Sequence, residues 1–205
     1  MNEGDNNKLP THPFWQFSLQ VYEEPNVEAA LLHLQDHYDL NINLVLYCCW
    51  FAKTGLGRIK QKEFKCVVES TRNWHRQVTE SLRKLRRKAS KHADDPSIAN
   101  IKKHILNTEI AAEHIEQLIL VERLLPNPDP YKTPEQRLKD AYFNIQTYTH
   151  LTRSIRDCHA DPHFIMLLAA TFHEIDLETI SACYNLKPSE KIRKTELEDV
   201  QGDLF

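Results

Sequence analysis

Apolar side chains recur every three to four residues along almost the whole chain, and proline, Asx or Thr residues interrupt the pattern at intervals. This spacing is the period of an amphipathic α-helix. The chain has only four glycines among its 205 residues, whereas tight turns and phosphate-binding loops need residues without a Cβ. Neither GxGxxG nor GxxxxGK[ST] occurs. The sequence therefore predicts an all-α fold and argues against β-rich and glycine-loop nucleotide folds.

The pattern predicts about eight helices and no sheet. The expected helices cover residues 13–23, 27–37, 44–53, 61–69, 71–92, 96–125, 134–158 and 162–173, with a further short helix near 177–184. The helix at 44–53 is apolar nearly all round, which predicts a central place in the core. A turn at Asp94-Asp95-Pro96 joins the two longest helices. We expect these two helices to pack as a long antiparallel hairpin over about residues 71–125.

One domain with tails is the expected organisation, because 205 residues are long for one compact domain and short for two. Residues 1–12 are polar and are expected to be a disordered tail, followed by a helical domain at 13–125. The prolines at 126–130 form a rigid break, and residues 126–186 are expected to be a helical extension packed on the first part. The charged residues 187–205 predict a mobile tail.

The net charge of -3 and the pI of about 6.4 exclude a protein whose whole surface is built for nucleic acid. The N-terminus lacks the apolar stretch of a secretory signal, and the apolar runs at 44–52 and 164–172 are too short to span a bilayer. The five cysteines are odd in number and are not spaced as a metal or disulfide framework. We therefore expect a soluble cytoplasmic protein with no membrane contact.

Several short motifs, in order along the first part of the chain, resemble an uncharacterised bacterial all-helical family that is known only as a domain of unknown function. The motifs are Phe14-Trp15-Gln16-Phe17-Ser18-Leu19, Leu34-Gln35-Asp36, Asn43-Leu44, Cys49-Trp50, Trp74-His75-Arg76, Leu82-Arg83 to Arg87, and Glu109 to Gln117. The resemblance covers about residues 13–124 and more loosely extends to about 155. It implies a small helical cytosolic protein and supplies no functional residues.

The densest positive charge lies at the expected tip of the hairpin. Its candidate residues for an anion or nucleic-acid patch are Arg83, Arg86, Arg87, Lys88, Lys91, Lys102 and Lys103. Antiparallel packing across the turn predicts that Glu113 lies near Arg76 and that Glu116 lies near Arg72 or Asn73. Acidic residues would therefore neutralise only the half of the basic helix that lies away from the turn. The tip would bind phosphate without reading bases. The alternative is a solvated helix end.

Two clusters have residue types that bind metals. His33 and His37 are separated by four residues on one expected helix face, and the alternative is a histidine pair at a helix end. Five possible ligands lie within Asp157 to His163, although Asp161 is already explained as a helix cap. Since neither cluster specifies a complete set of ligands, we expect no metal and no cofactor.

Two other patterns suggest chemistry but have simpler explanations. Cys48 and Cys49 are adjacent, which permits only a strained disulfide, and they lie within the helix expected to be the core. Glu109, Glu113 and Glu116 lie on one helix, but a di-iron carboxylate bundle needs Glu-x-x-His pairs, and Ala111 occupies the required position before His114. We therefore expect no catalytic residues in either set.

The last five residues resemble the peptide by which bacterial replication and repair proteins dock on the DNA sliding clamp. Gln201, Leu204 and Phe205 have the matching positions, and Gly202 stands where that motif more often has an aliphatic residue. In such a peptide a glutamine amide makes hydrogen bonds while the Leu-Phe pair fills an apolar pocket. The alternative is that Leu204 and Phe205 fold back onto the helical body.

The leading hypothesis is a non-catalytic, all-helical binding or adaptor protein with a protein partner, for which the sliding clamp is the candidate. A second hypothesis is a nucleic-acid-binding or ribosome-associated protein that uses the basic hairpin tip. A third is a metal enzyme that uses His33 and His37 or the cluster at Asp157 to His163. The sequence favours the first hypothesis because it shows no local catalytic signature.

Overall fold

The computed structural model describes residues 10–91, 95–124, 127–152 and 162–184 of the 205-residue chain. The predicted mobile C-terminal tail, with its candidate docking residues, lies outside the described residues. Most of the predicted N-terminal tail and part of the cluster at Asp157 to His163 do so as well.

The described residues form nine α-helices and one π-helical segment, with no strand among them. The helices are α1 (Pro13–Glu23), α2 (Val27–Tyr38), α3 (Ile42–Lys53), α4 (Gln61–Trp74), the π-helix η1 (His75–Thr79), α5 (Glu80–Ser90), α6 (Pro96–Arg123), α7 (Pro134–Thr152), α8 (Pro162–Thr171) and α9 (Leu177–Tyr184). Since α4, η1 and α5 follow one another without a gap, they form one continuous helix. The all-α prediction is confirmed.

The predicted break near residue 70 is wrong. Helix α4 runs through residue 70 without interruption, and the Ser70 hydroxyl donates to the carbonyl of Val67 at 2.7 Å. The irregularity comes later, as the π-helical turn from His75 to Thr79. A π-helix holds one extra residue per turn and is rare within a long α-helix.

The predicted helix start at Asp95 and Pro96 is confirmed, and local side chains also cap the start of α7. The carboxylate of Asp95 accepts a hydrogen bond from the Ser97 amide at 2.7 Å, with Pro96 in the first turn of α6. Before α7, the Thr133 hydroxyl accepts from the Gln136 amide at 3.3 Å, and the Gln136 side chain accepts from the Thr133 amide at 2.9 Å. These local signals set the ends of the helices because they satisfy backbone N–H groups that no helical carbonyl reaches.

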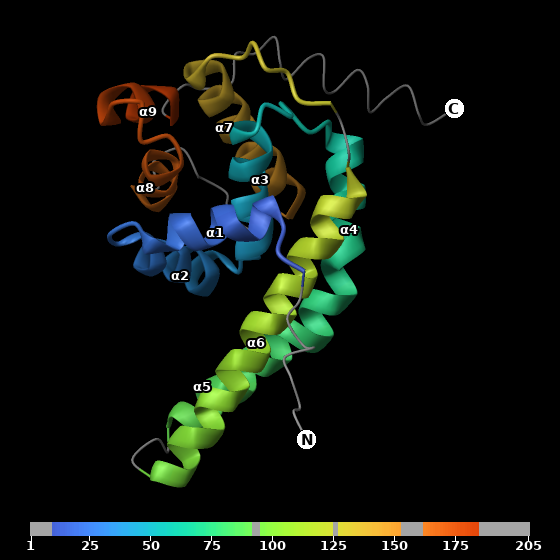
Figure 1. Ribbon diagram of the computed structural model, residues 1–205, viewed down its shortest axis with the longest axis vertical. Helices are drawn as coiled ribbons and strands as arrows, with labels where there is room; N and C mark the ends of the chain where they lie inside the picture. Colours follow the sequence, from blue (N-terminus) through green and yellow to red (C-terminus); the bar gives the residue numbers. More distant parts are fainter. Residues whose placement is uncertain (1–9, 92–94, 125–126, 153–161, 185–205) are drawn as a thin grey trace, which may run out of the picture.

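The molecule consists of a helical body and a long hairpin that projects from it (Figure 1). Helix α6 runs antiparallel to α4 and α5 and forms the hairpin with them. The body contains α1, α2, α3, α7, α8 and α9, with α3 at its centre. None of the described helices combines the length and apolar character needed to cross a membrane.

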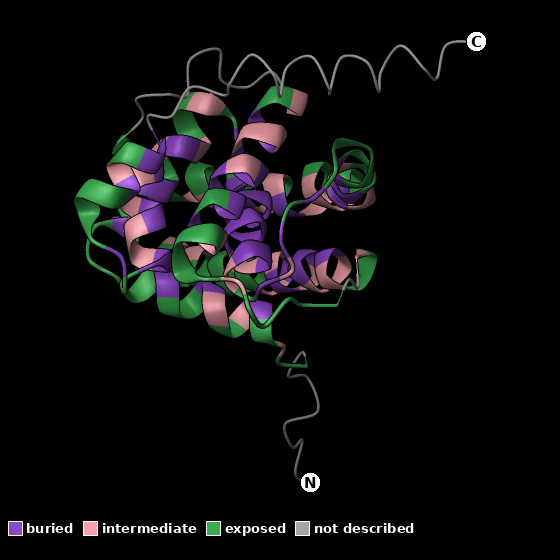
Figure 2. Ribbon diagram, turned by 90° about the horizontal axis from the view of Figure 1, so that it is seen from above, coloured by how far each residue is buried: buried purple, intermediate pink, exposed green. Residues whose placement is uncertain are grey.

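One hydrophobic core joins the first part of the chain to α7, α8 and α9. Helix α3 is buried along almost its whole length, and its main neighbour is α7. Buried side chains of the core include Tyr47 from α3, Ile145 from α7 and Leu168 from α8. Figure 2 shows the buried residues in purple, concentrated on the inner sides of the helices of the body. Each such side chain contributes about 1.5 to 3 kcal/mol when it leaves water. The body therefore holds the base of α6 in a fixed position, while the far end of the hairpin extends into solvent.

Candidate functional site

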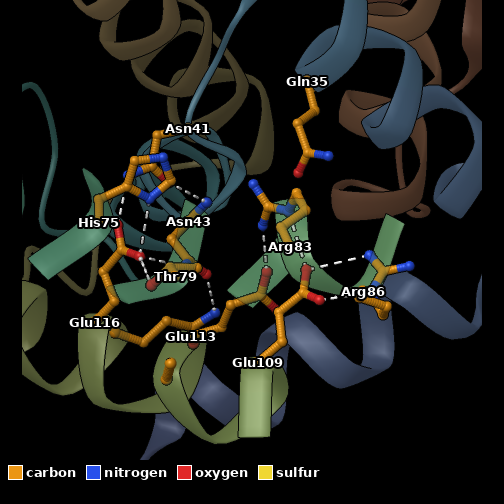
Figure 3. A network of polar contacts seen from close by, with 12 residues as sticks. Gln35, Asn41, Asn43, His75, Thr79, Arg83, Arg86, Glu109, Glu113 and Glu116 are labelled. Carbon is orange, nitrogen blue, oxygen red and sulfur yellow. Dashed lines mark hydrogen bonds and ion pairs between the residues drawn. The ribbon is translucent and has the colours of Figure 1, made fainter. Parts of the chain in front are cut away.

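Three carboxylates of α6 lie on the side of this helix that faces α3, η1 and α5. Glu116, Glu113 and Glu109 succeed one another from the base of the hairpin toward its tip (Figure 3). Their spacing of three and four residues places them on one helix face. The sequence singled out this same set of residues, but the partners come from distant segments.

Glu116 is completely buried and is surrounded by hydrogen-bond donors. Its carboxylate accepts from the side-chain amides of Asn41 and Asn43, the latter at 3.2 Å, and from the Thr79 hydroxyl at 3.2 Å. His75 Nδ1 lies 3.1 Å from Glu116 Oε2 (Figure 3). A buried carboxylate is stable only when its oxygens are paired in this way. Glu116 thus fastens the π-helical turn and the start of α3 to α6.

The network continues from Asn43 toward α1. Gln117 donates from Nε2 to Asn43 Oδ1 at 2.9 Å and accepts from the Ser18 hydroxyl at 3.2 Å. On the other side, the Asn41 backbone amide donates to the Tyr148 hydroxyl of α7 at 3.0 Å. The chain of polar contacts therefore crosses the molecule from α1 to α7, and each link fixes the orientation of the next.

Glu109 and Glu113 are held by arginines of α5. Arg83 donates from Nε to Glu109 at 3.1 Å and from a terminal nitrogen to Glu113 at 2.6 Å, and Arg86 donates twice to Glu109. Arg83 is only 9% exposed. Burial raises the pKa of Glu113, and the nearby positive charge of Arg83 opposes that shift. This cluster forms a polar floor in which most charges already neutralise one another.

The predicted pairing of Glu113 with Arg76 and of Glu116 with Arg72 is wrong, because Glu113 pairs with Arg83 and Glu116 lies against His75 and Thr79. The reason is the direction of the side chains. In both antiparallel helices each side chain leans toward its own N-terminus. Each contact therefore joins residues with higher sequence numbers, in both helices, than the pairing of facing Cα atoms predicts.

A cleft with a volume of about 270 Å³ lies above this floor, between α1 and α2 on one side and α5 and α6 on the other. Its polar lining includes Asn43, Arg83, Arg86, Glu109, Glu113 and Gln117. Its apolar lining includes Leu19, Tyr22, Leu32, Leu106 and Ile110, which are all exposed although they are large. Most of the large exposed apolar residues in the described chain thus surround one cleft, and such clustering is typical of binding surfaces.

The predicted basic patch divides into two groups. Arg83 and Arg86 belong to the floor of the cleft, and Arg87 pairs with Asp36 of α2. Lys88, Lys91 and Lys103 are exposed and Lys102 is half-buried, and the four form no ion pair with any residue in the described ranges. Arg83 and Arg86 thus join the two helices of the hairpin to each other, and Arg87 joins the hairpin to the body. The positive charge without a described acidic partner belongs to the four lysines.

The two candidate metal-binding clusters meet in space at His163, and their described residues do not form a metal site. His33 stacks on His37 and on His163 of α8, with both ring centroids at 4.0 Å. Nitrogen lone pairs of stacked rings lie in the ring planes and do not converge on one point. No group of three or more potential ligands within the described residues could hold a metal ion, and residues 157–161 lie outside them.

Cys48 and Cys49 lie unpaired in the core, as the sequence predicts for small buried residues. Burial raises the pKa of the Cys49 thiol to about 12, and burial also raises the pKa of Cys48. A thiol reacts as its thiolate. Both cysteines are therefore unreactive at neutral pH.

A further cluster, which the sequence analysis did not identify, lies where the chain enters α1. His12 caps this helix by accepting at Nδ1 from the Trp15 amide at 3.2 Å. The Trp15 ring stacks on His114 of α6 at 4.2 Å, and the two histidine rings are 5.2 Å apart. Burial, and then the proximity of His114, lower the pKa of His12 to about 4. Both histidines are therefore neutral at physiological pH and serve to pack α1 against α6.

The sequence of the same region was compared with models of known protein families. Residues 13–120 match the model of a family described as Protein of unknown function (DUF2390). The chain belongs to this family. No curated protein and no solved structure matches the chain. The match confirms the predicted resemblance to a domain of unknown function.

The matched range in this DUF2390 chain contains every residue that lines the cleft, from Trp15 to Gln117, and also Glu116. It does not contain α7, α8 or α9. The cleft is thus a property of the family region itself, and the C-terminal helices support it from behind by packing on α3 and α2.

Proposed function

We propose that this protein is a non-catalytic binding protein that acts as an adaptor, and that the cleft between α1–α2 and the hairpin receives a protein partner. The observation that carries the proposal is the ring of exposed apolar side chains, Leu19, Tyr22, Leu32, Leu106 and Ile110, around a floor of paired charges. Surfaces of this composition bury apolar area when a partner binds, while their polar groups fix its orientation.

The state of the floor favours binding over catalysis. A general base must be within reach of its substrate, and Glu116 is fully buried with hydrogen-bond donors at both of its oxygens. Both oxygens of Glu109 are likewise occupied by Arg83 and Arg86. These groups orient one another, which suits a rigid surface for recognition.

The C-terminal residues Gln201, Leu204 and Phe205 supply a second docking element in the proposal, with the DNA sliding clamp as its candidate partner in the cytoplasm of a bacterium. They lie outside the described residues, so their support is the sequence motif alone. Two separate docking elements, one in the body and one at the end of the chain, would allow the protein to connect two partners.

The test is affinity purification with four forms of the chain: wild type, a deletion of residues 201–205, Leu106→Glu, and the combination. We expect the deletion to remove the clamp and Leu106→Glu to remove a different partner. Ile101→Glu is the matched control, because Ile101 is 55% exposed on the same helix but does not line the cleft. Identical partners for wild type and Leu106→Glu would refute the role of the cleft, and identical partners with and without the tail would refute clamp docking.

A second candidate function is nucleic-acid or ribosome binding through the hairpin tip. The observation in its favour is the group of four lysines, Lys88, Lys91, Lys102 and Lys103, which have no acidic partner among the described residues. Such a group would contact phosphates and would give binding that weakens steeply with salt. Replacement of these lysines by glutamine should weaken salt-sensitive binding to RNA or DNA.

A further inference from the structure

The side of α6 that borders the cleft indicates which kind of partner the cleft binds. One side of this helix packs on α4 and α5, where Glu113 pairs with Arg83, and the exposed residues Leu106 and Ile110 lie beside that side and line the cleft. Leu106 and Ile110 are one helical turn apart and form a ridge on this side. Across the cleft, Leu19 and Tyr22 are three residues apart on α1 and form a second ridge. The two ridges border the cleft on opposite sides, and the groove between such ridges can receive the side chains of a further helix.

The cleft is open, which favours a macromolecule over a small molecule. Leu106 is 38% exposed and Leu32 is 43% exposed, although both line the cleft. Small-ligand sites bury most of the ligand in a closed pocket, whereas helix-binding grooves leave their anchoring residues accessible along their length. The partner helix would bury these side chains.

The charge of the cleft specifies the polar part of the partner. Arg83 donates to one oxygen of Glu113, Oε1, and no described residue donates to the other. Glu28, in the first turn of α2, also lines the cleft and forms no ion pair with a described residue. Burial, and then the negative charge of Glu113, raise the pKa of Tyr22; Arg83 opposes this shift and Glu28 adds to it. The cleft lining contains three carboxylates, Glu28, Glu109 and Glu113, and two arginines, Arg83 and Arg86. Because the two arginines pair with Glu109 and Glu113, the negative charge of Glu28 is left in excess.

We infer that the partner segment is an amphipathic α-helix that carries a lysine or arginine beside its apolar face. Its apolar residues lie between the ridge of Leu106 and Ile110 and the ridge of Leu19 and Tyr22, and its cation pairs with Glu113 and Glu28. The inference rests on the proposed binding function and adds to it the secondary structure and charge of the partner. The hairpin of a second copy, which exposes Leu85 of α5 and Ile101 of α6 outside the cleft, is the alternative occupant that the experiment must exclude.

The experiment uses a displayed library of helical peptides with Leu or Phe at positions i, i+4 and i+7, and with Lys, Glu, Gln or Ala allowed elsewhere. The full chain is the bait at physiological salt. We expect enrichment of peptides with a lysine next to the apolar stripe. The affinity of the enriched peptide is then measured by fluorescence anisotropy, and its helicity in the complex is measured by NMR.

Two pairs of variants separate the apolar and polar contributions. Leu106→Glu, on α6, and Leu32→Glu, on the opposite wall, should each weaken binding at least about tenfold, while Ile101→Glu should not. Glu113→Gln should weaken binding of the lysine peptide by about three- to tenfold. It should leave unchanged the affinity of the same peptide with norleucine in place of lysine. Glu122→Gln is the matched control, because Glu122 is exposed on α6 outside the cleft.

Each other outcome overturns the inference in a recognisable way. Enrichment of neutral or acidic peptides, or equal weakening of the lysine and norleucine peptides by Glu113→Gln, would refute the basic helix while leaving the cleft as a binding site. Binding only after deletion of residues 201–205 would assign the cleft to the tail. A dimer that Leu106→Glu dissociates would assign it to a second copy. If no peptide is enriched, the inference fails, and unchanged copurifying partners in Leu106→Glu would refute the binding function as well.

Discussion

The two ends of the hairpin contain similar numbers of polar side chains in opposite surroundings. At the base, Glu116 is fully buried and its oxygens are occupied by Asn41, Asn43 and Thr79, with His75 Nδ1 beside them. At the tip, Lys91 and Lys103 point into solvent and have no partner among the described residues. The same helix, α6, thus passes from the core to the outside within its 28 residues.

This difference shows where polar residues stabilise the fold and where they remain available for contact. A buried polar group costs several kcal/mol when its partners are removed, while an exposed charge contributes little. Glu109 and Glu113 lie between the two extremes, partly covered and partly open to the cleft. Mutational effects on stability should therefore decline steadily from base to tip, and effects on binding should be largest in the middle.

The largest effect is expected for Glu116→Ala. The substitution leaves buried amide, hydroxyl and imidazole groups without their acceptor and should lower the free energy of unfolding by about 3 to 5 kcal/mol. Urea denaturation followed by circular dichroism measures it, with Glu122→Ala on the exposed face of α6 as the control. A loss below about 1 kcal/mol would show that the base of the hairpin tolerates rearrangement and would remove the contrast with the tip.

Arg83→Met should have the next largest effect, because it removes the cation that lies between Glu109 and Glu113. The expected loss is about 2 to 3 kcal/mol at neutral pH, since Arg86 still pairs with Glu109. Without Arg83 nothing opposes the effect of burial as strongly, so the pKa of Glu113 in the folded state rises further above that in the unfolded chain. The loss should therefore shrink as the pH falls toward about 4.5, where the unfolded carboxyls also become protonated. A pH-independent loss would assign the effect to packing instead.

The sequence predicts the helices well, since their ends depend on local groups. Pro96 and Pro134, with the caps at Asp95 and Thr133, fix the starts of α6 and α7 without help from the rest of the chain. Two features depend instead on how the long helix packs on α6: the helix continues through Ser70, and it contains a π-helical turn at His75. No local sequence signal predicts either feature. The wrong side-chain pairing in the hairpin has the same origin, because Cα geometry alone ignores the lean of the side chains.

The candidate site was predictable only in part. The carboxylates of α6 are visible in the sequence as a set with helical spacing, but Asn41 and Asn43 read as a helix start and nothing connects them to Glu116. A signal was present in the apolar character of α6, since Leu106 and Ile110 lie away from the face that α5 covers. From the sequence, Leu106 and Ile110 are expected to be buried because they are apolar. Only the fold shows that α1 and α2 leave both residues exposed.

His12→Asn tests the base of the hairpin from the N-terminal side. The pKa of His12 lies near 4 in the folded protein, below its usual 6.5, so the unfolded state binds the extra proton between these values and stability falls as the pH decreases through this window. Asparagine keeps an acceptor for the Trp15 amide and does not titrate. The loss of stability between about pH 7 and pH 5 should therefore be smaller by about 1 kcal/mol in the variant.

A residual slope should remain in His12→Asn, because burial also lowers the pKa of His114. The measurement is urea denaturation at several pH values, with His104→Asn on the exposed part of α6 as the control. Parallel pH profiles for wild type and His12→Asn would mean that the histidine is protonated equally in both states, and that the entry of the chain into α1 is open to water.

The smallest effect on stability is expected at the tip, for the combined change of Lys88, Lys91 and Lys103 to Gln. These side chains have no described partner to lose, so the free energy of unfolding should change by less than about 0.5 kcal/mol.

The same variant tests the nucleic-acid alternative. If the tip binds phosphates, wild type should bind single-stranded RNA or duplex DNA at low salt. Removal of three cations should then reduce the slope of log K against log salt concentration by about three. Lys62→Gln with Lys65→Gln, on the exposed face of α4, controls for net charge. Equal binding by the tip variant and this control would reduce any affinity to nonspecific attraction, and no binding by wild type would leave the tip as a solvated helix end, completing the contrast with Glu116.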